Sequence, residues 1–336
     1  MALEFNSPLN FITPMLNLLI LLTLPEAVRL QYYNGLKSKF PKLNINVVDH
    51  HSKVSPFIEE ADVLVTFGPM MAEHVLEKAR HLKWIQALGS GVDGITNRVS
   101  LKDNVIVTNL HGIHGTPVSE AALMMMLGQA RHYKDMVQNQ SQAAWVRKAP
   151  VSLLKGKTVT IYGVGVISAE LAPKCKALGM RVLGISGQAR HVEGFDEILP
   201  RNASMKAIEE ADFLVLLTPY SEETHHLINK EIFARMKNTS QLINLARGGV
   251  VNEEDLLLAL NSGQIAGAAL DVFAQEPLPA DHPLWSQHNV TITPHMGGFY
   301  DEYVKEALPV IEENLKQFMA GNYIDMINIV RKESQT

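Results

Sequence analysis

The sequence predicts an α/β protein made of two doubly wound domains. The chain has 336 residues, about twice the length of a typical single domain. Short apolar runs, typical of buried strands, alternate along it with stretches of helical periodicity, an order that indicates parallel sheets with helices on both faces. Glycine-rich or polar motifs directly follow several of these runs. We therefore expect two such domains with a cleft between them.

The first series of elements lies in the N-terminal third of the chain. Strands are expected at residues 17–24, 45–48, 61–67 and 84–88, with helices at residues 26–40 and 71–80. Because strands and helices alternate in this series, neighbouring strands are expected to run parallel.

The second series begins with a helical segment rich in Ala, Leu and Met near Val118. Strands are expected at residues 158–162, 181–185, 213–217, 241–245, 267–272 and 290–293. After Gly298 a helical pattern resumes, with Val304, Leu308, Ile311, Leu315 and Phe318 on one face. Since the second sheet is by then complete, this helix is expected to pack on the first domain. The predicted domains are therefore residues 1–116 with 298–336, and residues 117–297.

Composition and charge exclude several classes of function. The formal net charge is −5 and no block of Lys and Arg stands out, so a nucleic-acid partner is not expected. The single cysteine, Cys175, excludes an internal disulfide and a multi-cysteine metal site, and a buried apolar role is expected for it. Residues 11–24 are too short to span a bilayer and follow Glu4 rather than a basic start. We read them as a buried strand and expect no metal, no membrane partner and a cytoplasmic location.

A glycine loop follows the expected strand at 158–162 and precedes a helix expected at 169–178. Gly163 would make the tight turn, and Gly165 would let the backbone approach a pyrophosphate at the helix N-terminus, beside Val166 and Ile167. Ser168 stands where a third glycine is usual, and its extra atoms are expected to crowd the contact between helix and strand. The loop predicts a dinucleotide site. The alternative is a strand–helix turn with a structural glycine pair.

The end of the next strand bears on the choice of cofactor. An NAD site usually carries an acidic residue there for the ribose hydroxyl, but the segment after Ile185 has no carboxylate. Ser186 and Arg190 would instead suit a 2'-phosphate, because a guanidinium binds that group well. We favour NADP(H), with NAD(H) as the alternative, since Arg190 also fits a plain surface residue.

Three motifs follow the last strands of the second series. Arg247 follows the strand at 241–245 and precedes two glycines, Glu276 follows the strand at 267–272, and His295 ends the strand at 290–293. All three side chains should lie at the carboxyl ends of parallel strands, where doubly wound sheets bind ligands. Each residue taken singly also has a structural alternative: Arg247 could start a helix, Glu276 could be an acid in a turn, and His295 could cap the end of a strand.

Together these motifs resemble the D-isomer-specific 2-hydroxyacid dehydrogenases, a family that includes glyoxylate/hydroxypyruvate reductases and phosphoglycerate dehydrogenases. The similarity runs from about Gly89 to the end of the chain. It implies a Rossmann NAD(P)-binding domain, a discontinuous flavodoxin-like substrate domain, and Arg247, Glu276 and His295 as the catalytic residues. It further implies a homodimer built on the helix near Val118.

The resemblance also assigns binding residues. Thr218, Pro219, Leu245 and Ala246 would border the cofactor together with His295, and Asp271 would contact the nicotinamide carboxamide, with a plain turn role as its alternative. Ser90 and Gly91 would bind the substrate carboxylate with Arg247 and His295. The sequence departs from the family around His111 and His114, where we expect solvated loop histidines, with a place in the substrate pocket as the alternative. His225 and His226 are expected on the surface.

The chemistry of 2-oxo acid reduction gives each catalytic residue a reason. Arg247 offers a permanently charged fork for the carboxylate and the neighbouring carbonyl oxygen. His295 can act as the acid in reduction and the base in oxidation, and Glu276 would hold its imidazole and favour the charged form. We expect hydride transfer between NAD(P)H and a small 2-oxo acid, of the glyoxylate or hydroxypyruvate kind, to give a D-2-hydroxy acid.

Two other functions compete with this interpretation. A formate dehydrogenase relative would share the fold, but that group has glutamine where Glu276 stands here. A non-catalytic, nucleotide-sensing interaction protein could keep the same fold and the same residues, so it remains the alternative.

Overall fold

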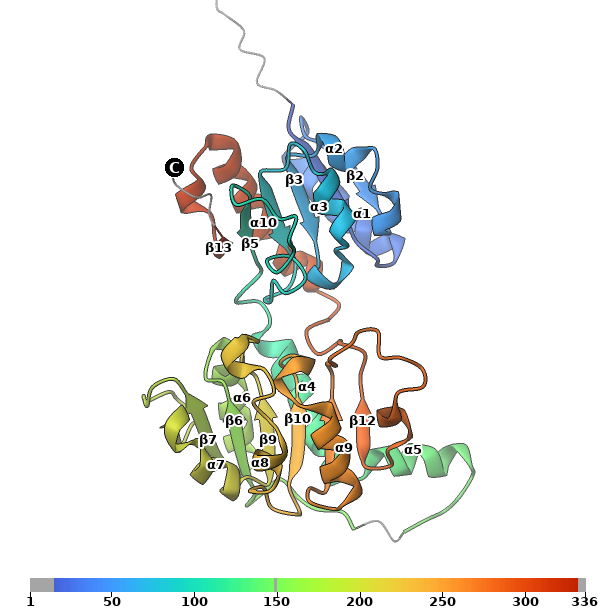
Figure 1. Ribbon diagram of the computed structural model, residues 1–336, viewed down its shortest axis with the longest axis vertical. Helices are drawn as coiled ribbons and strands as arrows, with labels where there is room; N and C mark the ends of the chain where they lie inside the picture. The colour runs from blue at the N-terminus through green and yellow to red at the C-terminus, as the bar shows by residue number, and fades with distance from the viewer. Residues whose placement is uncertain (1–14, 148–149, 332–336) are drawn as a thin grey trace, which may run out of the picture. The chain divides into compact units, whose positions relative to one another are not determined.

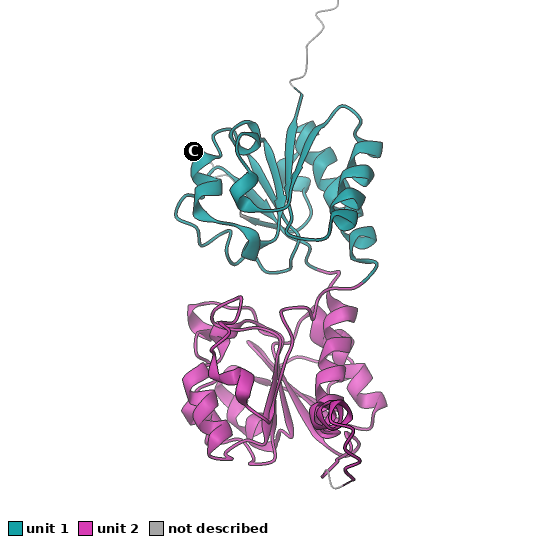
Figure 2. Ribbon diagram, turned by 90° about the vertical axis from the view of Figure 1, so that its right-hand side faces the viewer, with its two compact units in different colours: residues 1–111, 301–336 teal, residues 112–300 magenta. Residues whose placement is uncertain are grey.

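The chain folds into two compact units (Figures 1 and 2). The computed structural model describes residues 15–147 and 150–331. Unit 1 is built from the residues up to 111 and from 301 onward, and unit 2 from residues 112–300. The chain therefore leaves unit 1 once and returns to it once. Residues 11–14 of the expected N-terminal strand lie outside the described residues.

Unit 1 contains a six-stranded sheet in the order β13-β5-β4-β3-β1-β2. All neighbours pair in parallel except β13, which runs antiparallel to β5. Apart from β13 this is the flavodoxin-like order. The strands are β1 (Asn17–Leu21), β2 (Asn44–Val48), β3 (Val63–Thr66), β4 (Trp84–Ala87), β5 (Ile106–Thr108) and β13 (Ile329–Arg331). The helices are α1 (Glu26–Lys39), α2 (Phe57–Glu60), α3 (Glu73–Lys78) and α10 (Tyr303–Ala320).

Successive side chains of the unit 1 strands lie on opposite faces of the sheet. Ile85 of β4 belongs to the core formed with α2 and α3, whereas the ring of its neighbour Trp84 lies 5.3 Å from that of Phe318 in α10. Asn314 of α10 donates a buried hydrogen bond of 3.0 Å to Gln86 of β4. The C-terminal helix is thus an integral part of the unit that the N-terminal strands begin.

Unit 2 contains a seven-stranded, fully parallel sheet in the order β12-β11-β10-β9-β6-β7-β8. This is the Rossmann order with one further strand. The strands are β6 (Thr158–Tyr162), β7 (Arg181–Ser186), β8 (Glu197–Pro200), β9 (Phe213–Leu216), β10 (Gln241–Asn244), β11 (Gly267–Leu270) and β12 (Val290–Ile292). The order reverses between β6 and β9, which is where such sheets bind nucleotides.

Helices cover both faces of the unit 2 sheet, as Figure 1 shows for α4 behind it and α9 in front. They are α4 (Gly115–Ala130), α5 (Tyr133–Ser141), α6 (Val166–Ala177), α7 (Ser204–Glu210), α8 (Lys230–Phe233) and α9 (Glu253–Asn261). One core contains side chains of α4 and α6, and the other contains side chains of α7, α8 and α9. Cys175 lies in the α4–α6 core, where burial raises the pKa of its thiol to about 12. The expected apolar role of Cys175 is confirmed.

The predicted fold class is confirmed, and the differences concern short or terminal pieces. Strands β5, β8 and β13 have three or four residues each and were not predicted. Helix α3 is shorter than the expected 71–80, while α4 and α6 each begin three residues before their expected starts. Apolar periodicity alone places the body of an element better than its ends.

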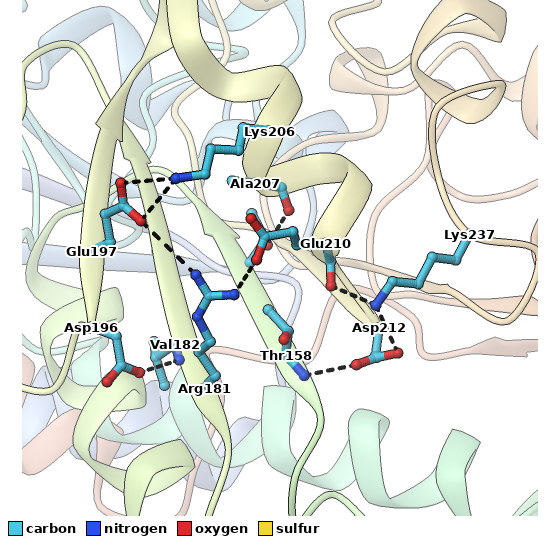
Figure 3. Close-up of polar contacts among 11 residues, drawn as sticks. Thr158, Arg181, Val182, Asp196, Glu197, Lys206, Ala207, Glu210, Asp212 and Lys237 are labelled. Carbon is cyan, nitrogen blue, oxygen red and sulfur yellow. Dashed lines mark hydrogen bonds and ion pairs between the residues drawn. The ribbon is translucent and has the colours of Figure 1, made fainter.

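Ion pairs lie at the amino ends of several unit 2 strands, among them β6, β7 and the edge strand β8 (Figure 3). Asp212, just before β9, accepts a 2.8 Å hydrogen bond from the Thr158 backbone N–H of β6 and also pairs with Lys237. Arg181, the first residue of β7, pairs with Glu210 and Glu197. Such partly exposed pairs contribute about 1 kcal/mol or less each. This edge is structural, and the motif residues follow the opposite, carboxyl ends of the strands.

No helix among the described residues is both long enough and apolar enough to cross a membrane.

Candidate active site

The glycine loop after β6 packs directly on the loop after β9. Gly163 has a φ of 105°, a left-handed conformation, and a Cβ added to it would lie 2.6 Å from the backbone nitrogen of Thr218. In contrast, a Cβ on Gly165 would meet no atom within 4 Å. Gly163 is therefore needed for the turn, and Gly165 leaves open space before the N-terminus of α6. Val166 and Ile167 begin that helix.

Ser168 closes the first turn of α6. Its hydroxyl accepts a hydrogen bond of 2.7 Å from the Gly165 N–H and donates one of 2.9 Å to the Gly165 carbonyl. The side chain is buried. The hydroxyl is thus used as a cap, and the expected crowding of the helix–strand contact stays a prediction. This cap also explains why α6 begins at Val166 rather than at the expected residue 169.

Arg190 lies against the same glycine loop. Its guanidinium donates a 2.5 Å hydrogen bond to the Val164 carbonyl. Ser186 is the last residue of β7, the strand beside β6, and is buried. A cation is thus held beside the loop that is expected to bind phosphates.

Three loops begin at the same level at the carboxyl edge of β10, β11 and β12. The strand register pairs Asn244 with Leu270, and Leu270 with Ile292. The loops that start there carry Arg247, Glu276 and His295 respectively. Sheet register therefore gathers the three predicted catalytic residues at one edge of unit 2, as expected for parallel strands.

The loop after β10 is shaped by Asn244 and by a backbone contact. The buried Asn244 amide accepts from the Ala246 N–H and donates to the Arg247 carbonyl, each at 3.1 Å. A Cβ on Gly248 would lie 1.8 Å from the carbonyl carbon of Phe273, in the loop after β11. Leu245 and Ala246 are buried. The two loops touch through their backbones.

Asp271 shapes the turn that carries His295. Its carboxylate accepts hydrogen bonds from the Met296 N–H at 2.9 Å and the Gly297 N–H at 2.8 Å, as well as from the Thr293 hydroxyl. His295 has a φ of 53°, which is uncommon outside glycine, and its own N–H bonds the Asp271 carbonyl at 2.8 Å. Asp271 therefore has the turn role, and its contact with a nicotinamide stays a prediction.

His295 and Glu276 form a short pair, with 2.7 Å between Nδ1 and Oε2. The other Glu276 oxygen accepts the Phe273 N–H at 3.0 Å. Burial acts to raise the pKa of Glu276, but the hydrogen bond and charge of His295, the Phe273 N–H and the Arg247 charge outweigh it. The net pKa of Glu276 is lowered, so this residue is a carboxylate at neutral pH.

The remaining predicted residues lie in loops of their own units. Thr218 and Pro219 follow β9 in unit 2, and Thr218 is buried beside the glycine loop. Ser90 and Gly91 follow β4 in unit 1, where the Asn109 side-chain amide donates a 2.6 Å hydrogen bond to the Ser90 carbonyl.

The histidines outside the three motifs differ from one another. His111 is exposed, as expected, but the solvated position expected for His114 is wrong, because it is buried just before α4 with its ring near Gly298. His225 is exposed and its ring stacks on that of His226 at 3.8 Å.

Asn244 and Thr293 shape the loops of Arg247 and His295 but were not among the predicted site residues. Asn244 ends β10 and Thr293 directly follows β12, so a polar residue at the carboxyl end of a strand was the available signal in both cases.

Fold and site together define a two-unit α/β protein with a dinucleotide-binding loop and an Arg, Glu and His set at the edge of one sheet. Residues 123–297 match the family described as D-isomer specific 2-hydroxyacid dehydrogenase, NAD binding domain. The chain belongs to the D-isomer specific 2-hydroxyacid dehydrogenase family, as the resemblance predicted.

Named relatives agree with this assignment. A D-3-phosphoglycerate dehydrogenase of Methanocaldococcus jannaschii is 34% identical over 82% of this chain and 54% of that protein, so the chain spans about half its length. A glyoxylate reductase of Korarchaeum cryptofilum is 34% identical over 79% of this chain and 81% of that protein. An NADPH-dependent glyoxylate/hydroxypyruvate reductase from Sinorhizobium meliloti, solved with NADP and sulfate, has a TM-score of 0.79 at 26% identity, covering 94% and 98% of the two chains.

Gly248→Ala should destabilise unit 2 strongly. The added Cβ would overlap the Phe273 backbone, which has no flexible end to move away, and overpacking of this kind costs about 1–3 kcal/mol. Urea unfolding monitored by circular dichroism would measure the change. Gly187→Ala is the matched control, because that exposed loop glycine has open space around it and no positive φ. Equal unfolding midpoints for the two variants would contradict the contact.

Proposed function

We propose that this protein is an NAD(P)-dependent oxidoreductase that transfers hydride between NAD(P)H and a small 2-oxo acid, giving a D-2-hydroxy acid. The observation that carries the proposal is the 2.7 Å pair of His295 and Glu276 at the sheet edge that also holds Arg247. Glyoxylate or hydroxypyruvate is the proposed substrate type. The similarity to reductases named for these two acids supports that choice.

The residues around the glycine loop fit a dinucleotide. No atom lies within 4 Å of where a Gly165 Cβ would be, so the space at the N-terminus of α6 is open. The N–H groups of the first turn of this 12-residue helix point toward that space. We assign to the cofactor site Gly163, Gly165, Val166, Ile167, Ser186, Arg190, Thr218, Pro219, Leu245, Ala246, Asp271 and His295. NADP(H) is the proposed cofactor because Arg190 places a cation beside the loop. When bound, the cofactor supplies or accepts the hydride.

Each catalytic residue has a defined task in this proposal. The Glu276 carboxylate accepts the Nδ1–H of His295, so Nε2 of the imidazole is left to face the substrate. His295 gives its proton to the carbonyl oxygen in reduction and takes it back in oxidation. Arg247 binds the substrate carboxylate and the neighbouring oxygen. In unit 1, the backbone N–H groups of Ser90 and Gly91 stay the predicted carboxylate-binding groups.

We also propose a homodimer in the cytoplasm, with a second copy of the chain covering α4 and α5. Exposed apolar side chains gather on these helices, namely Met124, Leu127, Tyr133, Met136 and Val137. Light scattering in solution should give the mass of two chains for the natural protein. Met136→Lys combined with Val137→Lys should give the mass of one, and an unchanged mass would point to another interface.

Turnover tests the proposed activity directly. We expect reduction of glyoxylate and hydroxypyruvate, faster with NADPH than with NADH, and weaker reduction of pyruvate and phenylpyruvate. Arg247→Ala should lower kcat/KM at least about 100-fold, because a charged substrate contact is lost. Arg235→Ala is the control, since that arginine pairs with Glu209 on the surface. Binding of NADPH without turnover of any acid would favour the nucleotide-sensing interaction protein.

The pH dependence of the two directions separates the tasks of His295 and Glu276. The lowered pKa of Glu276 keeps its charge at neutral pH, and this charge is lost only as the pH falls below the usual range of a glutamate. The difference between the two directions should therefore come from His295, which acts as the acid in one and as the base in the other. Reduction starts from the protonated imidazole and should slow as the pH rises, whereas oxidation should slow as the pH falls. Coincident profiles of initial rates would argue against this role of His295.

A further inference from the structure

Glu253, the first residue of α9, extends away from its own helix to the loop that carries Glu276. Its Oε1 accepts the Ala274 N–H at 2.8 Å, and its Oε2 lies 3.5 Å from Nε2 of His282. Helix α9 does not need this side chain as its cap, because Asn252 accepts the Asp255 N–H at 3.2 Å. The Glu253 side chain is only 17% exposed. Its contacts therefore serve the neighbouring loop.

The loop after β11 is held by two carboxylates on consecutive peptide groups. Glu276 accepts the Phe273 N–H, and Glu253 accepts the next N–H along the chain, that of Ala274. The first bond lies within the loop, whereas the second ties it to α9. Because Glu276 is two residues beyond Ala274, any shift at Ala274 would move the carboxylate that bonds His295.

His282 ties the far end of the same loop to Glu253. Its Nδ1 accepts the Leu284 N–H at 3.3 Å, which leaves the ring proton of the neutral imidazole on Nε2, the atom that faces Glu253. Residues 274 and 282 are thus both in contact with one carboxylate. The segment between them contains Glu276, so its two ends are fixed relative to α9.

We propose that Glu253 is a positioning residue, which holds the 273–282 loop so that the Glu276 carboxylate stays within hydrogen-bond reach of His295. This inference rests on the proposed function for its effect on catalysis. Its structural part, the placement of Glu276 against His295, does not depend on turnover.

Three substitutions of Glu253 test the proposal. Glu253→Ala removes the acceptor, and Glu253→Asp keeps the charge but is one methylene shorter, so both should lower kcat about 10- to 100-fold, the cost of a misplacement near 1 Å. Glu253→Gln keeps an oxygen for the Ala274 N–H and gives up only the longer contact with His282, because its NH2 group would face the Nε2–H. Its kcat should therefore stay within about 3-fold of the natural value. The KM for NADPH should change little in all three. Glu254→Ala, an exposed neighbour, is the matched control and should leave kcat unchanged.

A second readout works without turnover. The ring N–H proton of His295, bonded to a carboxylate, should resonate far downfield in the NMR spectrum of the natural protein. It should weaken or move upfield in Glu253→Ala and Glu253→Asp but persist in Glu253→Gln and Glu254→Ala. A role in stability alone would lower the melting temperature without moving this signal.

The outcomes distinguish this inference from the proposed function. If the natural protein reduces no 2-oxo acid but the His295 signal responds to Glu253 as expected, the function fails and the positioning role stands. Suppose instead that the natural protein reduces a 2-oxo acid, but Glu253→Ala and Glu253→Asp have the same kcat and the same His295 signal as Glu254→Ala. The positioning role is then overturned. If Glu253→Ala does not fold, the comparison of Glu253→Asp with Glu253→Gln decides the question.

Discussion

The backbone contact between Gly248 and Phe273 sets how the loops that carry Arg247 and Glu276 lie against each other. Strands β10 and β11 are adjacent and in register, so the loops that follow them start about 5 Å apart. At Gly248 these loops approach so closely that no side chain fits between them. Arg247 is the residue before this contact, and Glu276 lies three residues after Phe273. The separation of a guanidinium and a carboxylate is thus set by main-chain packing, which is much stiffer than side-chain contacts.

Prediction from the sequence succeeded where a strong local pattern could be combined with a general rule of α/β folds, such as the parallel order of alternating strands and helices. The apolar runs that became β6, β7, β9, β10, β11 and β12 were placed within two residues at each end. Once those strands are recognised as parallel, Arg247, Glu276 and His295 must emerge at the same edge of the sheet. The glycine loop was readable for the same reason, because a strand precedes it and a helix follows it. Local pattern and global topology agreed at these positions.

The features that escaped prediction depend on contacts between residues far apart in the chain. Asp271 accepts from Met296 and Gly297, more than 20 residues later, and nothing in the sequence around it indicates that partner. His114 is buried against a glycine from the opposite end of unit 2. Strand β13 pairs with β5 across more than 200 residues. The cap made by Ser168 was not predicted for another reason: the expectation considered the size of the side chain and not the hydrogen bonds that its hydroxyl makes.

The return of α10 and β13 to unit 1 has a consequence for how the newly made chain folds. Unit 2 is continuous, and all of its strands are made before α10 leaves the ribosome. Unit 1 is begun before unit 2 but is completed after it, because its sheet lacks an edge strand and Trp84 lacks its Phe318 neighbour until residues 303–331 are synthesised. Domains usually fold in the order in which they are synthesised. Here unit 2 can complete its fold before unit 1, although its synthesis starts later. Until then, the apolar face that α10 will cover stays open to water or to a chaperone.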